Sequence, residues 1–352
     1  MKSAKPIIYV TRDSERANSI EQNENYIIVS NEKGETLDTY ELLQTGRVEK
    51  LMKENKNAAI LVFQNNFRIE RFCTEKKWKL LNPSAELSKK IEEKISQYEW
   101  LSDLRKFLPP TEIKKVSEIR FEEKPIVLQF NHAHTGLGTK IIRSGKELEE
   151  LSEKFPDRPA RISDFINGPV FTLNIVVAKN GVFCGNISYQ ITGLADFTDN
   201  PFSTVGNDWK LPQKILSEKE REKIFEIGEK IGEKMKKDGW LGLFGIDVIL
   251  DEKFRKIYLL EINARQPAST TFESLLQKTA GKNMTTSEAH IAALQGEKVS
   301  DIQKITDGAQ IVLREKKTAR EISRTHSDKG IMESHGKLNA EGEKIRSLVI
   351  KK

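Results

Sequence analysis

The sequence has little cysteine and no long apolar run. Only Cys73 and Cys184 occur among 352 residues, and neither belongs to a CxxC pair. Two isolated thiols argue against a disulfide framework or a cysteine-based zinc centre, so we expect both to pack inside a protein of the reducing cytoplasm. No stretch of about 18 apolar residues is present, and the start lacks the apolar core of a signal peptide. The sequence therefore predicts a cytoplasmic, globular protein without a membrane span.

Charge of one sign is not in large excess either. Lys and Arg number 58 and Asp and Glu 52, a net charge of +6, and both signs interleave in stretches such as residues 217–237. Such interleaving is typical of a helix with a solvated, ion-paired face. The sequence also has no aromatic-plus-basic ribonucleoprotein pattern and no zinc-finger spacing. Nucleic acid is therefore disfavoured as a partner, and a basic nucleic-acid interaction protein remains only an alternative.

Two nucleotide-binding signatures are missing. No GxGxxG follows the first expected strand, and no GxxxxGK[ST] occurs, which argues against a dinucleotide domain and a Walker-type loop. A glycine-containing bend is nevertheless present in VLQFNHAHTGLGTK, residues 127–140. Its Gly136 and Gly138 could free backbone N–H groups for a phosphate, or they could form only a tight turn. His132 and His134 share the loop, but a zinc site needs three or four ligands and no third is in view.

Short apolar strands alternate with helix-capable segments through the first hundred residues. The expected strands are residues 6–10, 25–30, 58–64 and 78–82, with helices at 35–55 and 67–77. This alternation predicts a parallel sheet covered by helices, an open α/β unit. A long amphipathic helix is expected over residues 84–108, and Pro109-Pro110 ends it and marks a boundary.

A strand-rich region follows the double proline. Strands are expected at residues 124–130, 158–166, 170–178 and 182–191, with a helix at 147–155. Residues 195–213 have the composition of a polar loop, and the charged helix comes next. Two apolar strands then flank the polar turn DEKFRK within residues 241–270, which predicts a hairpin. The fold class is therefore α/β: a parallel N-terminal domain, a small strand-rich lid and a central antiparallel sheet with helices.

The hairpin carries polar side chains on strands that are otherwise apolar. If its turn centres on Phe254, Asp247 lies opposite Glu261. Residues two apart on a strand share a face, so Asn263 and Arg265 point the same way as Glu261. Two like charges so close repel each other unless a cation neutralises them. A hard divalent ion does so, since Mg²⁺, or Mn²⁺ in its place, takes one or two carboxylates plus substrate phosphates. An exposed polar sheet face is the alternative interpretation.

This hairpin resembles the metal-binding hairpin of the ATP-grasp superfamily. There a carboxylate on the first strand, and a Glu and an Asn on the second, hold Mg²⁺ against the phosphates of ATP. Those roles fall on Asp247, Glu261 and Asn263. Arg265 matches an arginine near the reacting phosphate or substrate, which makes Glu261, Asn263 and Arg265 the expected catalytic set. The order of parts agrees over about residues 1–300, so the resemblance implies an ATP-grasp architecture.

The resemblance also implies where ATP would lie. Backbone groups around Asp164, Phe165 and Ile166 would bind the edge of the adenine, because a strand offers a donor and an acceptor at fixed spacing. Gly136 and Gly138 would belong to a flap over the phosphates.

Two positions depart from the family pattern. A glutamate that often contacts the ribose is Val170 here, and the lysine usual before the glycine loop is Gln129. The positive charge for the phosphates would then come from Lys94, Lys140 or Arg161. Gln129 itself stays in the expected ATP-binding set. Among these cations Lys94 is the least distinct, because neighbouring lysines compete for its role.

The acceptor side is expected in the polar segment 188–209, where Gln190, Asn207 and Asp208 are weak substrate candidates. An ordinary excursion held by Asx turns explains the same composition. The expected units are an N-terminal domain with its linker helix (1–108), a lid (109–182), a central subdomain with the hairpin (183–310) and a C-terminal segment (311–352).

The resemblance implies an ATP- and Mg²⁺-dependent ligase. It would activate a small-molecule carboxylate as an acylphosphate, and an amine or similar nucleophile would then displace phosphate, most simply forming a carbon–nitrogen bond. Because Gln129 replaces the usual lysine, a protein that binds ATP without ligase activity is the alternative. The acid, the nucleophile and the oligomeric state, a homodimer included, remain open.

Overall fold

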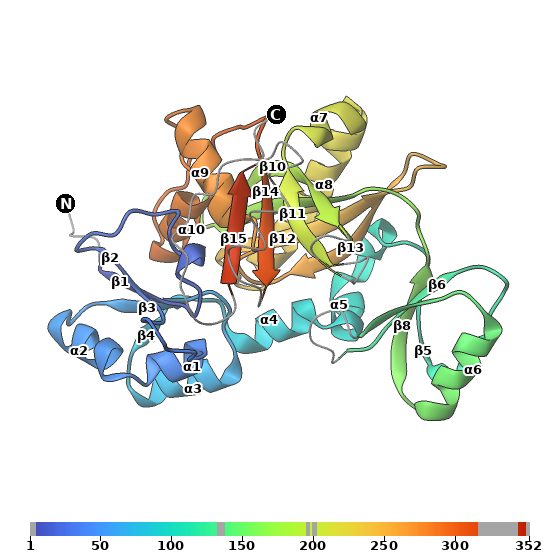
Figure 1. Cartoon of the computed structure of the whole chain (residues 1–352), viewed down its shortest axis with the longest axis horizontal. Helices are drawn as coiled ribbons and strands as arrows, with labels where there is room; N and C mark the ends of the chain where they lie inside the picture. Colours follow the sequence, from blue (N-terminus) through green and yellow to red (C-terminus); the bar gives the residue numbers. More distant parts are fainter. Residues whose placement is uncertain (1–4, 132–137, 195–197, 199–202, 316–343, 350–352) are drawn as a thin grey trace.

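Three sheets make up the fold of this computed structural model. It describes residues 5–131, 138–194, 198, 203–315 and 344–349. Figure 1 shows the N-terminal unit and the small lid at opposite ends of the molecule, with a large central sheet above the helices that join them. Among the described residues, no helix is both long and apolar enough to cross a bilayer. The α/β class predicted from the sequence is confirmed.

The N-terminal unit is a parallel sheet in the order β2-β1-β3-β4. Its strands are β1 (Ile7–Val10), β2 (Tyr26–Val29), β3 (Ala59–Val62) and β4 (Lys79–Leu80). Its helical elements are η1 (Ser14–Arg16), α1 (Thr39–Leu43), α2 (Gly46–Glu54) and α3 (Phe67–Glu75). All four side chains of β1 are buried, although they point alternately to the two faces of the sheet, so both faces of the sheet are covered. The helix expected over 35–55 is two helices, α1 and α2.

The linker expected as one helix over 84–108 is broken. It consists of α4 (Ala85–Glu92), α5 (Lys94–Leu101) and the 3-10 helix η2 (Ser102–Phe107). Glu93 leaves helical geometry with ψ 135° and separates α4 from α5. Asn131 stabilises the break, because its Oδ1 accepts from the N–H of Ile95 at 3.0 Å and its Nδ2 donates to Glu93 Oε2 at 2.7 Å. The next residue, Lys94, therefore starts a new helix directed at the central sheet.

The lid is an antiparallel sheet in the order β5-β8-β6-β7. Its elements are β5 (Thr111–Lys115), η3 (Val116–Glu118), β6 (Ile126–Gln129), β7 (Thr139–Ile142), α6 (Gly145–Lys154) and β8 (Pro159–Asp164). β5 was not expected, because its sequence TEIKK is mostly charged and it lies at the sheet edge. A small apolar core, which includes Leu128, Leu148 and Leu151, lies between this sheet and α6.

The central sheet is antiparallel throughout, in the order β13-β12-β9-β10-β11-β14-β15. Its strands are β9 (Val170–Ala178), β10 (Gly181–Thr192), β11 (Thr204–Asp208), β12 (Gly242–Leu250), β13 (Ile257–Asn263), β14 (Ala309–Glu315) and β15 (Lys344–Val349). The helices packed with it are α7 (Leu211–Ile215), α8 (Glu218–Lys237), α9 (Thr270–Ala280) and α10 (Thr286–Gln295). Its main core includes Phe171, Ile175, Ile227 and Phe244.

Three boundary expectations need correction here. The predicted lid end at residue 182 is wrong, because β9 pairs with both β10 and β12 and so belongs to the central sheet. The segment 195–213, expected to be a loop, contains β11 and the start of α7. The segment 311–352, expected to be separate, supplies most of β14 and all of β15 to the same sheet.

The hairpin register around the carboxylates is confirmed. Asp247 pairs with Glu261, and Gly245 with Asn263. The turn is not symmetric about Phe254, because a β-bulge shifts the register by one residue between Asp247 and Val248. Opposite that step, Leu260 is the unpaired extra residue of β13.

Candidate functional site

Two carboxylates and an amide meet at the end of the β12–β13 hairpin. Asp247 Oδ2 accepts from Asn263 Nδ2 at 3.0 Å. Its other oxygen, Oδ1, accepts from Thr172 Oγ1 and Gln190 Nε2, both at 2.7 Å. Strands β9, β10 and β13 thus each place a polar side chain against Asp247 of β12. Gln190, a weak substrate candidate from the sequence, lies at the carboxylate site itself.

The linker adds a cation to this group. The ammonium of Lys94 forms a short ion pair with Glu261 Oε1, across 167 positions of sequence. The Lys94 side chain is 14% exposed and that of Glu261 44% exposed, so the lysine approaches from the protected side. In the sequence Lys94 is the least distinct of the three candidate cations, because Lys89 and Lys90 lie close by. The break at Glu93 separates it from them, since they belong to α4 and Lys94 starts α5.

The electrostatics of the two carboxylates differ. Burial, and then the charge of Glu261, raise the pKa of Asp247 to about 6. Desolvation alone would raise the pKa of Glu261 as well, but the ammonium of Lys94 holds it below its usual value. The site therefore contains one carboxylate that is paired with a lysine and one whose hydrogen-bond partners are all neutral side chains.

A buried arginine lies next to the carboxylates. Arg161 is 4% exposed, on β8 of the lid directly opposite Gln129 on β6. Its Nε and Nη2 donate to Gln129 Oε1 at 2.9 and 2.5 Å, and Nη1 donates to Gln97 Oε1 at 3.0 Å. Nη2 also donates to the carbonyl of Leu260 at 3.1 Å, at the bulge of the hairpin.

Arg161 is a cation held by neutral acceptors. Burial lowers its pKa to about 10, whereas the charge of Glu261 favours its protonated form. Gln129, where the resemblance leads us to expect a lysine, thus works as an acceptor that positions a neighbouring positive charge.

The strand end expected to bind adenine has one free donor. The N–H of Asp164 donates to Pro110 O at 3.1 Å, and that of Phe165 to Pro125 O at 3.2 Å. The N–H of Ile166 has no hydrogen-bond partner among the described residues. Of the three predicted positions, only Ile166 could therefore offer a main-chain donor to a ring nitrogen.

The remaining predicted residues are less centrally placed. Lys140 is exposed on β7, and Gly138 accepts from the N–H of Phe130 at 2.9 Å. Asn207 is buried and donates to Ser188 Oγ at 3.1 Å. The Oδ1 of Asp208 accepts from the N–H groups of residues 210 and 211 at 2.7 and 2.9 Å, which is a turn cap. Gly136, His132 and His134 lie outside the described residues.

Sequence reasoning missed a cluster on the N-terminal unit. Arg16 in η1 lies over the ring of Phe63, with its guanidinium carbon 3.8 Å from the ring centroid. The guanidinium of Arg265 lies 5.9 Å from the same ring. Arg265 also pairs with Glu92 of α4 at 3.3 Å and donates to Asn263 Oδ1 at 2.9 Å. The position of Arg16 just after β1, at the carboxyl edge of a parallel sheet, is the signal that could have found it.

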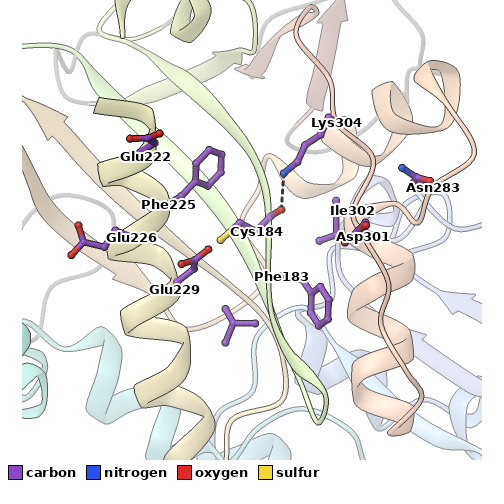
Figure 2. A pocket seen from close by; sticks show the side chains of 11 residues that line it. Phe183, Cys184, Glu222, Phe225, Glu226, Glu229, Asn283, Asp301, Ile302 and Lys304 are labelled. Atoms are coloured by element: carbon purple, nitrogen blue, oxygen red, sulfur yellow. Dashed lines mark hydrogen bonds between the residues drawn. The ribbon is translucent and has the colours of Figure 1, made fainter. Parts of the chain in front are cut away.

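A hollow in the described part of the chain lies away from this site. Its volume is about 660 Å³, and it lies between α8, the start of β10 and residues 301–304, as Figure 2 shows. Its carboxylates are Glu222, Glu226, Glu229 and Asp301, against the single ammonium of Lys304. None of the predicted site residues lines it, and its acidic wall would repel a triphosphate.

The chemistry of the hairpin fits a hard divalent cation. Among the described residues, no three His, Cys, Asp or Glu side chains gather into a metal centre of their own. Mg²⁺, however, usually takes one or two carboxylates and completes its shell with substrate phosphates and water. Asp247 and Glu261 could supply two carboxylates and Asn263 an amide oxygen, and a cation would offset the charge of Glu261 that, after burial, raises the pKa of Asp247.

Comparison with known proteins agrees with this geometry. A family model described as an ATP-grasp domain matches residues 91–269, just over half of the chain. No curated protein matches the sequence.

Several solved structures share the fold. N5-carboxyaminoimidazole synthetase from Staphylococcus aureus gives a TM-score of 0.69 over 99% of this chain and 94% of that chain, at 13% identity. The synthase from Aspergillus clavatus, in complex with ADP and 5-aminoimidazole ribonucleotide, gives 0.68 over 100% and 95%, at 16% identity. Biotin carboxylase from Campylobacter jejuni gives 0.62 over 88% and 75%, at 14% identity. At these identities the likeness concerns the fold.

Proposed function

This chain belongs to the ATP-grasp family, and from that membership we propose that it is an ATP- and Mg²⁺-dependent ligase that activates a carboxylate for attack by an amine or similar nucleophile. The observation that carries the proposal is the pair of carboxylates on the hairpin, Asp247 and Glu261, which Lys94 approaches from the linker. Similar structures were solved with ADP, ATP or MgADP, which supports the choice of nucleotide and ion.

The hairpin and linker would handle the phosphates. Asp247, Glu261 and Asn263 would hold Mg²⁺, which supplies charge neutralisation at the transferred phosphoryl group. Lys94 lies on Glu261 and would add a positive charge beside the same phosphate oxygens. Arg161 is fixed next to Glu261 by Gln129 and would take the electrostatic part of the absent lysine.

The lid would hold the base. The N–H of Ile166, which has no partner among the described residues, would donate to an adenine ring nitrogen, whereas the N–H groups of Asp164 and Phe165 donate to carbonyls of the protein. Because β8 carries both Arg161 and the residues before Ile166, one strand would connect the base to the phosphates.

The reaction proceeds in two displacements. A carboxylate oxygen of the acid attacks the γ-phosphorus, and the bond between that phosphorus and the ADP oxygen breaks, which yields an acylphosphate and ADP. The amine lone pair then attacks the acyl carbon, the carbon–oxygen bond to phosphate breaks, and the amine loses its proton. Catalysis comes from positioning and charge stabilisation, so no covalent enzyme intermediate is needed.

The test is a screen for ADP release with pooled carboxylates and amines in the presence of Mg²⁺. We expect acid-dependent ADP release from the wild type and a loss of at least about 100-fold in Glu261→Gln, because the charge of one proposed metal ligand and its ion pair with Lys94 are lost. Glu233→Gln, an exposed carboxylate of α8, is the matched control and should behave as wild type. Turnover in Glu261→Gln equal to wild type would refute the site.

The alternative function predicts a different pattern. A protein that binds ATP without ligase activity would bind a nucleotide analogue in calorimetry and release no ADP with any acid and amine. The charge held by Arg161 at the position of the missing lysine argues for the ligase.

A further inference from the structure

The carboxyl edge of the N-terminal sheet faces the end of the metal hairpin. β1 leads directly into η1, which carries Arg16, and β3 leads into Phe63. The carbonyl of Arg16 accepts from Gln266 Nε2 at 2.8 Å and from Thr271 Oγ1 at 3.1 Å. Both donors follow the hairpin in sequence, so η1 is fixed against the element that carries Arg265.

The side chain of Arg16 is held flat but keeps most of its donors. Its guanidinium stacks on Phe63, and its Nε donates to Asp13 Oδ2 at 3.4 Å. Within the part of the chain that the structure describes, Nη1 and Nη2 donate no hydrogen bond, although the side chain is only 20% exposed. An arginine offers five N–H donors, and its planar fork matches the oxygens of a carboxylate or phosphate. Four of the five N–H donors of this largely buried guanidinium therefore have no acceptor among the described residues.

Two positive charges also crowd around one ring. Burial lowers the pKa of Arg16, Asp13 opposes that shift, and the nearby charge of Arg265 lowers the pKa further. Asp13 does not neutralise Arg16 alone, because Arg12 also donates to both carboxylate oxygens of Asp13, each at 3.2 Å. Like charges brought this close are stabilised by an anion between or beside them.

Arg265 connects this cluster to the reaction site. It donates to Asn263, which donates to Asp247, so it lies one side chain away from the proposed metal ligands. Arg265 is therefore placed for the carboxylate that reacts. Arg16, on the other unit, is placed for a more distant part of the same substrate.

We propose that the acid substrate carries a second anionic group, a carboxylate or a phosphate, and that Arg16 binds this group against Phe63 while Arg265 binds the reacting carboxylate. The inference rests on the proposed function, because it assigns the substrate class of that site. It makes the N-terminal unit part of the active site rather than only a support for it.

The test measures binding of small acids by calorimetry to the full chain, loaded with Mg²⁺ and a non-hydrolysable ATP analogue. The probes are succinate and 3-phosphoglycerate, called dianions here because each has two anionic groups, and propionate, which has one. We expect at least one dianion to bind about tenfold or more tightly than propionate, and its chemistry separates a carboxylate from a phosphate. Arg16→Ala should lower the affinity for that dianion to the affinity for propionate, and Arg16→Lys should give an intermediate value. The affinity for the ATP analogue should not change in either variant.

The controls separate binding from folding. Arg16→Ala keeps the backbone carbonyl that joins the two units, and its thermal midpoint should lie near that of wild type. If the alanine variant unfolds, the affinities of Arg16→Lys and of the wild type for the dianion are compared instead, and a lower affinity of Arg16→Lys supports the proposal. Arg47→Ala removes a paired arginine elsewhere on the same unit and should leave dianion binding intact.

Two results would overturn the proposal: dianion affinity that does not change in the Arg16 variants, or no preference of the wild type for either dianion over propionate. Failure of the proposed function looks different. The wild type would then release no ADP with any acid and amine, whereas the calorimetric binding of a dianion would still depend on Arg16.

Discussion

Replacing Asp247 with asparagine should stabilise the cation-free protein while it removes activity. Asp247 accepts three hydrogen bonds, yet burial and Glu261 raise its pKa from 3.8 to about 6. A folded pKa above the unfolded one means that, between about pH 4 and pH 6, the folded protein keeps a proton that the unfolded chain releases. Stability therefore falls as the pH rises through this window, and above pH 6 the whole penalty is present.

The size of the effect follows from that shift. Two pKa units correspond to about 3 kcal/mol, an upper bound because solvent at the mouth of the site screens the charge. Asparagine cannot ionise, but its amide loses one of the three accepted hydrogen bonds, a cost of about 1 kcal/mol. The net gain for Asp247→Asn above pH 7 is then about 1–2 kcal/mol. For a chain of this length that is roughly 1–3 °C in thermal midpoint.

The assay is thermal unfolding in EDTA without nucleotide, at pH 7.5 and at pH 4. Asp247→Asn should melt above wild type at pH 7.5 and lose that advantage at pH 4. Adding Mg²⁺ with the ATP analogue should reverse the order, because only the wild type gains from the ligand. Asp157→Asn, an exposed carboxylate of the lid, should show no such pH dependence. An Asp247→Asn variant that melts below wild type at pH 7.5, or whose advantage is equal at both pH values, would contradict the reasoning.

Two further predictions concern Gln129 and His290. Gln129→Lys should weaken calorimetric binding of the ATP analogue by about tenfold, because the ammonium would repel Arg161 and remove its acceptor; tighter binding than wild type would show that the family's lysine was simply lost. His290 accepts from the N–H of Leu243 at 2.9 Å, and burial lowers its pKa to about 4. Since a depressed histidine pKa favours the neutral folded form, stability should fall as the pH drops from 6.5 toward 4. His290→Asn, which keeps an acceptor, should flatten that part of the thermal midpoint profile relative to wild type, and an unchanged slope would exclude His290 as its source.

The hairpin was predictable because its contacts are local. Asp247 and Glu261 are joined by one short turn, so spacing and alternation sufficed to bring them opposite each other. The family and the fold class followed from that motif and from the order of parts, and both are confirmed. The bulge at Leu260 was not predictable, because it depends on which neighbours bury each side of β13.

The cations of the site were harder to predict, because their positions depend on distant partners. Lys94 reaches Glu261 only because Asn131 breaks the linker helix one residue earlier, from 38 positions away. Arg161 becomes a substitute charge only through its pairing with Gln129 across the lid. No local pattern encodes either contact.

The N-terminal contribution was missed for the same reason. Arg16 and Arg265 meet at Phe63 from distant parts of the sequence. In the sequence alone, Arg16 cannot be distinguished from a surface arginine. The nucleotide contacts and the acceptor side stay predictions, to be tested by the experiments above.

The bulge in β13 has a consequence for how this protein can vary. Ile257 and Leu259 face the main core on the turn side of the bulge, and Ile262 and Ala264 face it on the other side, although strict alternation would turn one pair outward. The extra residue, Leu260, thus lets the side chains on both sides of the bulge point to the core. Arg161 holds Leu260 in place by donating a hydrogen bond to its carbonyl. The tip beside the exposed Phe254 is held by its own contacts, since Arg255 Nη2 donates to Glu220 Oε2 at 2.7 Å and the N–H of Glu252 donates to Asn167 O at 3.2 Å. The bulge therefore lets the tip and the carboxylate end of one strand each keep the alternation that its own neighbours require.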